Sequence, residues 1–286
     1  MSVQNKQQDL SRLLSMITVI MVAALALLLV GLFILTGVYL ITELPSLSLP
    51  TISLPFFSGG EDTDPSDQPP SVEPPVDDGV TLGATADAGI AYQDKLIFVG
   101  DSLTAHLINR GVLSGGTATQ QVWRSESNMI NLNSEVVNAK IVYPGTGVKM
   151  TIAEAAKTAK PEILIITLGT DWGVSYLNET DFKACYTNLI KDIQKASPKT
   201  TIVLQSIFPV TATCTSLNNQ KIDTCNTWVK AIAAENGCYY LNTQSVLKDS
   251  NNCLKAEYCN STDGIHLGKN AYEAILQYIR THAVPD

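Results

Sequence analysis

Short apolar segments alternate with longer amphipathic ones from about residue 92 onward, and this alternation restricts the fold more than any other feature. The predicted strands are almost continuously apolar, as in E-I-L-I-I-T-L at 162–168. Such strands are typical of a parallel sheet that is covered by helices on both faces. We predict strands at 95–100, 140–143, 162–168, 200–208 and 238–241, and helices at 103–110, 151–160, 181–197, 218–235 and 271–282.

Glycines end or follow three of these predicted strands. They are Gly100, Gly145 and Gly169. Ligand sites in open parallel sheets lie beyond the carboxyl ends of the strands. We therefore expect the loops at these glycines to meet at one edge of the sheet.

A serine stands at the end of the first predicted strand, in G-D-S-L at 100–103. A serine hydroxyl is a weak nucleophile unless a base takes its proton and a third group orients that base. His266 is the candidate base, because Asp263 lies three residues before it and can hold its imidazole in one tautomer. The alternative is that Asp101 and Ser102 only cap the helix that follows.

The chain has two further histidines and no second serine-hydrolase motif. We interpret His106 and His282 as structural or surface residues. A nucleophile elbow requires G-x-S-x-G, and the position two residues after Ser102 is Thr104. Trp172 either lines a substrate groove or fills a gap in the core.

The stretches G-D-S-L at 100–103 and D-G-I-H at 263–266 resemble the first and last sequence blocks of the SGNH (GDSL-type) hydrolases. The resemblance covers about residues 92–284. It implies a three-layer α/β/α flavodoxin-like fold with a parallel sheet. It also implies that Ser102 is the nucleophile, His266 the base and Asp263 its orienting partner, with no cofactor.

The same resemblance implies an oxyanion hole. Its donors would be the Ser102 N–H, the N–H of Gly145 (or of Gly147), and an asparagine after the third strand. This chain has Asp171 at the asparagine position. An asparagine amide donates to an oxyanion, whereas an ionised aspartate repels it. Three explanations stay open: Asp171 is protonated by burial, it turns away and leaves two backbone donors, or the domain is a weak or inactive catalyst.

The N-terminal part predicts a membrane anchor. Residues 13–42 carry no charge and, as a helix, would be about 45 Å long, which exceeds the roughly 30 Å of a bilayer core. Lys6 and Arg12 precede this segment and no basic residue follows until Lys95, so we expect residues 1–12 in the cytoplasm. A cleaved signal peptide, the alternative, has an apolar region of only about 7–15 residues.

Residues 43–90 predict a stalk. They contain eight of the 13 prolines, nine acidic residues and no basic residue. Three tandem pentads that begin L-P, at 44–58, exclude a helix, and the acidic part buries too little surface to fold alone. We therefore expect an extracytoplasmic domain at 91–286. The pentads could instead bind a partner or lie against the membrane.

All six cysteines lie in the outer domain, which we expect in an oxidising compartment. The local guesses for disulfides are Cys253 with Cys259, Cys214 with Cys225, and Cys185 with Cys238. The alternative is that some are buried free thiols, of which Cys238 is the best candidate.

The sequence has no C-x-x-C, so we expect no zinc or other metal site. A net charge of −8 without basic clusters argues against nucleic-acid binding.

These features together predict a membrane-tethered serine esterase that hydrolyses O-acyl, and in particular O-acetyl, esters through an acyl-enzyme. The expected substrate is a small ester or an acylated carbohydrate of the cell envelope, because an anchored enzyme suits a fixed substrate. Two alternatives stay open. One is an envelope O-acetyltransferase, and the other is a surface-displayed module that binds carbohydrate or ester without turnover.

Overall fold

A computed structural model of the chain describes residues 78–285. The predicted membrane span at 13–42 and most of the predicted stalk therefore lie outside the described residues. Within 78–285, no helix has both the length and the apolar character needed to cross a bilayer.

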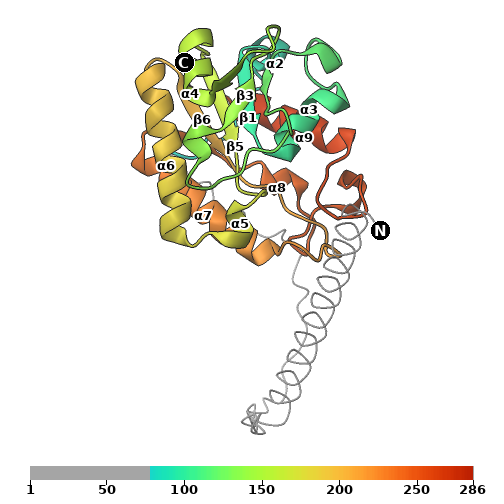
Figure 1. Cartoon of the computed structure of the whole chain (residues 1–286). Helices are drawn as coiled ribbons and strands as arrows, with labels where there is room; N and C mark the ends of the chain where they lie inside the picture. Colours follow the sequence, from blue (N-terminus) through green and yellow to red (C-terminus); the bar gives the residue numbers. More distant parts are fainter. Residues whose placement is uncertain (1–77, 286) are drawn as a thin grey trace, which may run out of the picture. The chain divides into compact units, whose positions relative to one another are not determined.

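The domain is built on a five-stranded parallel sheet, as the sequence predicts (Figure 1). The strand order is β2-β1-β5-β6-β7. Because β1 lies between β2 and β5, the loops that follow these three strands are neighbours at the carboxyl edge. The strands are β1 (Leu96–Gly100), β2 (Val122–Trp123), β5 (Ile163–Thr167), β6 (Thr201–Gln205) and β7 (Tyr239–Leu241).

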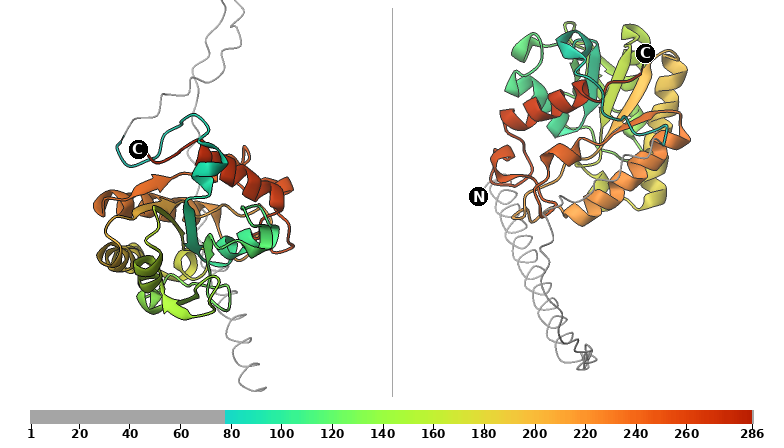
Figure 2. Two further views of the ribbon diagram at one scale, coloured as in Figure 1. Left: turned by 90° about the horizontal axis from the view of Figure 1, so that it is seen from above. Right: turned by 180° about the vertical axis from the view of Figure 1, so that it is seen from behind.

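Helices cover both faces of this sheet (Figure 2). One face packs against α4 (Ile152–Ala159), α6 (Glu179–Ala196) and α7 (Asn219–Glu235). The other packs against α3 (Ser102–Arg110) and α9 (Lys269–Arg280). The shorter helices are α2 (Gly89–Gln93), α5 (Gly173–Tyr176), α8 (Gln244–Leu247), and the 3₁₀ turns η1 (Gly116–Ala118), η2 (Val136–Asn138) and η3 (Ala256–Tyr258).

Strand periodicity explains why two separate cores form. Successive side chains of a strand point to opposite faces of the sheet. In β1, Phe98 packs in the core on the α3 and α9 side, whereas Val99 packs in the core on the α4, α6 and α7 side. In β5, Ile165 and Ile166 divide in the same way. The sheet is thus buried on both sides, which accounts for its almost continuously apolar strands.

The prediction that residues 140–143 form a strand of the main sheet is wrong. These residues begin β3 (Lys140–Val142), which pairs antiparallel with β4 (Lys149–Thr151) in a separate two-stranded sheet. The turn at 144–147 reverses the chain, and the Tyr143 N–H donates to the Val148 carbonyl (2.8 Å). The second strand of the main sheet is instead the two-residue β2.

The predicted boundary at residue 91 lies too late in the chain. Thr81 forms a parallel bridge with Tyr240 of β7, and the Leu82 N–H donates to the Tyr240 carbonyl (2.9 Å). The Leu82 side chain is buried. The Asp78 carboxylate pairs with Lys230 of α7 (2.5 Å). The last residues assigned to the stalk therefore belong to the folded domain and extend its sheet at the β7 edge.

The predicted disulfides are not formed: all six cysteines lie in the described part of the chain, and each is a free thiol. Cys185, Cys225 and Cys238 are buried in the core that involves α6 and α7, where they pack as small apolar side chains. Burial raises the pKa of the Cys225 thiol to about 11 and that of Cys238 to about 12. The buried-thiol alternative for Cys238 is confirmed.

Candidate active site

Ser102 lies at the carboxyl edge of the sheet, where β1 passes directly into α3. A side chain at Gly100 has no room, because a Cβ there would come within 2.1 Å of the Thr167 carbonyl oxygen and 2.2 Å of Thr104 Oγ1. Asp101 is the N-cap of α3 and accepts a hydrogen bond from the Leu103 N–H (3.2 Å). Ser102 is thereby fixed as the first residue of the helix, with its side chain half-buried.

Asp101 is completely buried beneath Ser102. Its carboxylate also accepts a hydrogen bond from the Thr170 N–H (3.1 Å), so it joins the loop after β1 to the loop after β5. Burial raises the pKa of Asp101 to about 7, and the nearby charge of Asp171 adds to the rise. The helix-capping role that the sequence offered as an alternative for Asp101 is therefore real, and it positions the candidate nucleophile.

Asp263 and His266 come together as the sequence predicts. Asp263 Oδ2 lies 2.6 Å from His266 Nδ1. Asp263 Oδ1 accepts hydrogen bonds from the Ile265 N–H (2.7 Å), the His266 N–H (3.2 Å) and the Ser261 hydroxyl. Burial acts to raise the pKa of Asp263, but these hydrogen bonds outweigh it and hold the pKa well below its usual range. Asp263 is thus an ionised acceptor at neutral pH, and it leaves His266 Nε2 for another partner.

The loop that carries Asp263 and His266 is held by the segment after β6. The Thr211 N–H donates to the Gly264 carbonyl (2.9 Å). Gly264 has φ +76, and a Cβ there would lie 2.3 Å from Thr211 Oγ1. Only glycine fits this close approach with a positive φ. The D-G-I-H stretch therefore needs its glycine for packing against the neighbouring loop.

Three contacts place this loop against the helix that begins at Ser102. The Tyr272 hydroxyl of α9 is buried and donates to the Leu103 carbonyl (2.7 Å). The His106 and His266 rings pack with centroids 4.8 Å apart and a tilt of 34°. When the side-chain amide of Asn260 is turned so that its oxygen faces Arg110, this oxygen accepts hydrogen bonds from both terminal nitrogens of the guanidinium group (2.9 and 3.2 Å). Because His106 lies one turn after Ser102, the His266 ring lies beside the first turns of α3.

His106 has a structural role, which is one of the two roles that the sequence suggests for it. Burial lowers the pKa of His106, and its electrostatic interactions with His266 and Arg110 lower it further, against an opposing effect of Asp263. Its Nδ1 is buried without a hydrogen-bond partner in the described part of the chain. We conclude that His106 packs as a neutral ring against His266.

Asp171 does not turn away from the candidate nucleophile. Its Oδ2 accepts a hydrogen bond from the Ser102 N–H (3.2 Å). The family pattern would place an amide donor here, and the carboxylate instead binds the backbone donor that an oxyanion would need. Two of the three sequence-based explanations, protonation and weak catalysis, therefore stay open for Asp171.

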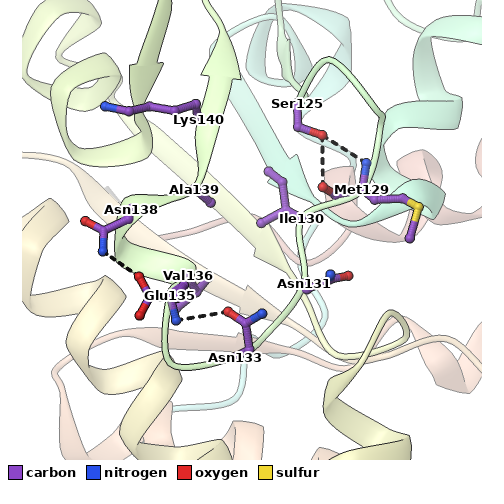
Figure 3. Close-up of a pocket in the computed structure, with 10 residues that line it drawn as sticks. All are labelled: Ser125, Met129, Ile130, Asn131, Asn133, Glu135, Val136, Asn138, Ala139 and Lys140. Carbon is purple, nitrogen blue, oxygen red and sulfur yellow. Dashed lines mark hydrogen bonds between the residues drawn. The ribbon is translucent and has the colours of Figure 1, made fainter. Parts of the chain in front are cut away.

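The expectation that Gly145 follows the second strand of the parallel sheet is wrong. Gly145 lies in the turn between β3 and β4 and follows no strand of the parallel sheet. The residues that follow the second strand of the sheet are Arg124 and Ser125. Ser125 lines a hollow of about 280 Å³ together with Met129 (Figure 3). The other lining residues are Ile130, Asn131, Asn133, Glu135, Val136, Asn138, Ala139 and Lys140.

The arrangement brings to one region a serine, an oriented imidazole and a carboxylate, which are the side chains that serine acyl transfer requires. The described residues hold no hydrogen bond between the Ser102 hydroxyl and the His266 imidazole, although His266 is oriented by Asp263 and lies beside α3. Catalytic hydrogen bonds in proteins without substrate are often long and tighten in the complex. Nowhere in 78–285 do three or more metal-ligating side chains form a cluster that could hold a metal ion.

Solved structures from several bacteria match part of this chain. A protein of Streptococcus pneumonia assigned as a platelet activating factor is 20% identical, with a TM-score of 0.48 over 65% of this chain and 82% of that one. The lipopolysaccharide acetyltransferase periplasmic domain of Salmonella ser. Paratyphi A is 17% identical, with a TM-score of 0.45 over 65% and 82%. A family two carbohydrate esterase from Clostridium thermocellum is 15% identical, with a TM-score of 0.45 over 65% and 62%.

Comparison with curated proteins finds no match. The model of the GDSL-like lipase/acylhydrolase family, by contrast, matches residues 98–274. This match spans more than half of the chain and contains G-D-S-L at 100–103 and D-G-I-H at 263–266. With the parallel sheet and its helical layers, it establishes that the chain belongs to the GDSL-like lipase/acylhydrolase family.

Proposed function

We propose that this protein is a serine esterase that hydrolyses O-acyl, and in particular O-acetyl, esters. The observation that carries the proposal is the hydrogen bond between Asp263 and His266 (2.6 Å), in a loop held against the helix that begins at Ser102. A surface histidine near an aspartate is common, but here the loop that carries the pair packs against α3, the helix whose first residue is Ser102. Family membership supports the same chemistry.

In this mechanism Ser102 Oγ attacks the ester carbonyl carbon and its proton passes to His266 Nε2. Nε2 is the acting nitrogen because Nδ1 faces Asp263. The tetrahedral intermediate expels the alcohol, which takes the proton from His266, and an acyl-Ser102 ester remains. Water then attacks this ester with His266 as base, releasing the acid and restoring the Ser102 hydroxyl. Asp263 stays ionised throughout and stabilises the imidazolium.

The oxyanion must displace Asp171 from the Ser102 N–H before that N–H can stabilise negative charge. The carboxylate now accepts this hydrogen bond, and an ionised carboxylate next to an oxyanion would oppose its formation. A proton on Asp171, or a rotation of its side chain, removes the obstacle. We therefore expect a slower enzyme than one with asparagine at this position.

The proposal is tested with the full-length chain, purified in mild detergent and mixed with p-nitrophenyl acetate. The wild-type chain should release p-nitrophenol faster than the background, and Ser102→Ala should reduce the rate to background. His266→Gln should do the same while the protein stays folded, as judged by circular dichroism. A folded wild-type chain no more active than Ser102→Ala would contradict the proposal.

A second candidate function is acetyl transfer to a carbohydrate. The observation that favours it is the carboxylate at the Ser102 N–H, which departs from the asparagine of the family pattern. Transfer and hydrolysis share the acyl-Ser102 step and differ in whether a sugar hydroxyl or water attacks it. Supplying an acetyl ester with a carbohydrate acceptor, and measuring acetylated sugar against free acetate, separates the two. A chain that reacts with neither would support a non-catalytic binding module.

The position of the enzyme in the cell is part of this proposal. The uncharged run at 13–42, with Lys6 and Arg12 before it, supports a single membrane span with the catalytic domain outside the cytoplasm. An anchored enzyme suits an acylated carbohydrate of the cell envelope. Fusion of a reporter that is active only outside the cytoplasm to the C-terminus tests the orientation. An inactive reporter on a well-expressed, membrane-bound fusion would contradict it.

A further inference from the structure

Two large aromatic side chains stand exposed on the loop that follows β5. Trp172 is 45% exposed and Tyr176 is 70% exposed. Their rings contact each other, with centroids 4.5 Å apart and planes tilted by 37°. Of the alternatives that the sequence left open for Trp172, filling a gap in the core is therefore excluded.

The backbone at Trp172 is strained. Trp172 has φ +77 and ψ −54, and the Gly173 N–H donates to the Asp171 carbonyl across it (3.1 Å). This is a γ-turn of the rare, strained type, which a bulky residue seldom adopts. Such conformations persist only where the surrounding structure enforces them, and they cluster at binding and catalytic sites.

The surrounding structure holds this loop at several points. The Thr170 N–H donates to the buried Asp101 carboxylate (3.1 Å), and the Val174 N–H donates to the Gly169 carbonyl (2.8 Å). Gly173 packs so tightly against Leu132 and Phe182 that a Cβ would come within 3.1 Å of each. The pair of rings is thus presented on a rigid base, which reduces the entropy lost when a ligand binds.

The pair lies next to the candidate nucleophile. Trp172 directly follows Asp171, whose carboxylate accepts the Ser102 N–H (3.2 Å). On the other side, the Leu132 N–H donates to the Asp171 carbonyl (3.4 Å). Asn131 and Asn133, which flank Leu132 in the chain, line the hollow drawn in Figure 3.

This hollow is rich in side-chain amides. Asn131, Asn133 and Asn138 line it, together with Glu135 and Lys140 (Figure 3). Asn133 and Asn138 hydrogen-bond within the segment. Amide groups offer both donors and acceptors, which match the hydroxyls of a sugar better than the methylenes of an acyl chain.

We propose that the Trp172–Tyr176 pair binds a pyranose ring of the carbohydrate that carries the ester, with the amide-lined hollow receiving a neighbouring sugar unit. A pyranose has apolar C–H faces that stack on aromatic rings and a rim of hydroxyls that require hydrogen bonds. The exposed pair and the hollow supply these two kinds of contact, and the hydrogen bond from the Leu132 N–H to the Asp171 carbonyl joins the two segments that carry them. The inference rests on the proposed esterase function only for the position of the ester, at Ser102.

The main competing occupant of the aromatic pair is the acyl chain of a lipid ester. An acyl chain favours an enclosed apolar channel, because its burial provides the binding free energy. Trp172 and Tyr176 instead form an open surface, and the hollow carries three amides and two charged groups beside its apolar residues. These features favour the sugar.

Binding is tested without catalysis, by the fluorescence of Trp172. The full-length chain is titrated with unacetylated hexamers of β-1,4-linked glucose and of N-acetylglucosamine. At least one hexamer should change the tryptophan emission saturably, and Trp172→Gly should abolish the change. Glycine adopts positive φ without strain, so this variant should fold. Trp172→Phe should retain binding when a dye-labelled hexamer is used, and Ile90→Ala, which removes another exposed apolar side chain, should have no effect.

Kinetics then locate the sugar relative to the ester. Trp172→Gly and Tyr176→Ala should each raise the KM for the O-acetylated hexamers by about tenfold, and the ratio of kcat/KM for these hexamers to kcat/KM for ethyl acetate should fall by at least about threefold. An equal loss on both substrates, or a loss confined to long-chain acyl esters, would overturn the proposal. The proposal would also be overturned if the wild-type chain bound neither hexamer. A chain that binds a hexamer but hydrolyses no ester would instead overturn the proposed function and leave the sugar site standing.

Discussion

The backbone N–H of Ser102 donates a hydrogen bond to Oδ2 of Asp171 (3.2 Å), so the group expected to stabilise an oxyanion already has an acidic side chain as its partner. The same carboxylate contributes to the raised pKa of Asp101, which is buried below Ser102. Asp171 thus influences both the nucleophile and the residue that positions it.

Replacing Asp171 with asparagine should therefore raise the esterase rate. The amide can still accept the Ser102 N–H through its oxygen, but it carries no charge and can turn its NH₂ toward the oxyanion. One such donor is worth about 3–4 kcal/mol in known acyl-transfer sites, so we expect kcat to rise by at least about tenfold at pH 8. The measurement is p-nitrophenyl acetate hydrolysis by the full-length chain, with Asp192→Asn, an exposed carboxylate on α6, as the control. A lower rate in Asp171→Asn would show that the carboxylate assists the reaction.

The thermal stability of the protein should fall as the pH rises toward 8. Burial, followed by the charge of Asp171, raises the pKa of Asp101 to about 7, above its ordinary value of 3.8. The folded state therefore binds this proton more tightly than the unfolded state. The resulting stabilisation is complete below about pH 4 and is lost as the pH rises through about 7.

This dependence on pH should weaken in Asp171→Asn, because the variant lacks the negative charge next to Asp101. The difference in Tm between pH 5 and pH 8, measured by calorimetry, should be smaller in Asp171→Asn than in the wild-type chain. Asp192→Asn should retain the wild-type difference. An unchanged difference in Asp171→Asn would mean that Asp171 does not contribute to the raised pKa of Asp101.

The hydrogen bond from Tyr272 to the Leu103 carbonyl should matter for both stability and activity. Tyr272→Phe leaves this buried carbonyl without its partner, which costs about 1–3 kcal/mol in the free energy of unfolding. It should also lower kcat, because the bond joins α9 to the first turn of the helix that carries Ser102. Tyr92→Phe is a matched control, since its hydroxyl accepts the Val284 N–H (3.0 Å) and Tyr92 precedes β1, at the opposite end of that strand from Ser102. Equal losses of activity in the two variants would contradict a positioning role.

All six cysteines should react as free thiols in the unfolded protein. The measurement is thiol titration of the full-length chain in denaturant without reductant, and the expected result is six thiols per chain. In the native protein Cys225 and Cys238 should react slowly, because burial raises the pKa of both thiols and restricts access. A count of four or fewer in denaturant would show that disulfides form.

Residues whose roles depend on short local stretches could be predicted from the sequence. Asp263 and His266 are only three residues apart, so their hydrogen bond needs one loop conformation and no distant partner. The strands at 95–100 and 162–168 are long enough for their apolar character to be clear. Ser102 could be placed at a strand end for the same reason.

Other features could not be predicted because their causes lie in tertiary contacts. β2 has two residues, which is too short for a periodicity signal, whereas the apolar run at 140–143 resembles a strand of the parallel sheet although the turn at 144–147 signals a hairpin. For this reason Gly145, which lies in the turn between β3 and β4, is wrongly predicted to follow a strand of the parallel sheet. The strained turn at Trp172 and the bond between Tyr272 and Leu103, 169 residues apart, depend on packing that no local pattern reports.

The central claim is that Ser102 is a nucleophile activated by the His266 and Asp263 pair. The most direct measurement is the reaction of the folded full-length chain with a fluorophosphonate, followed by mass spectrometry of the modified peptide. We expect a covalent adduct on Ser102, formed faster than with any other serine and suppressed in His266→Gln. A folded chain in which Ser102 stays unmodified between pH 5 and pH 9, or reacts equally fast in His266→Gln, would contradict it.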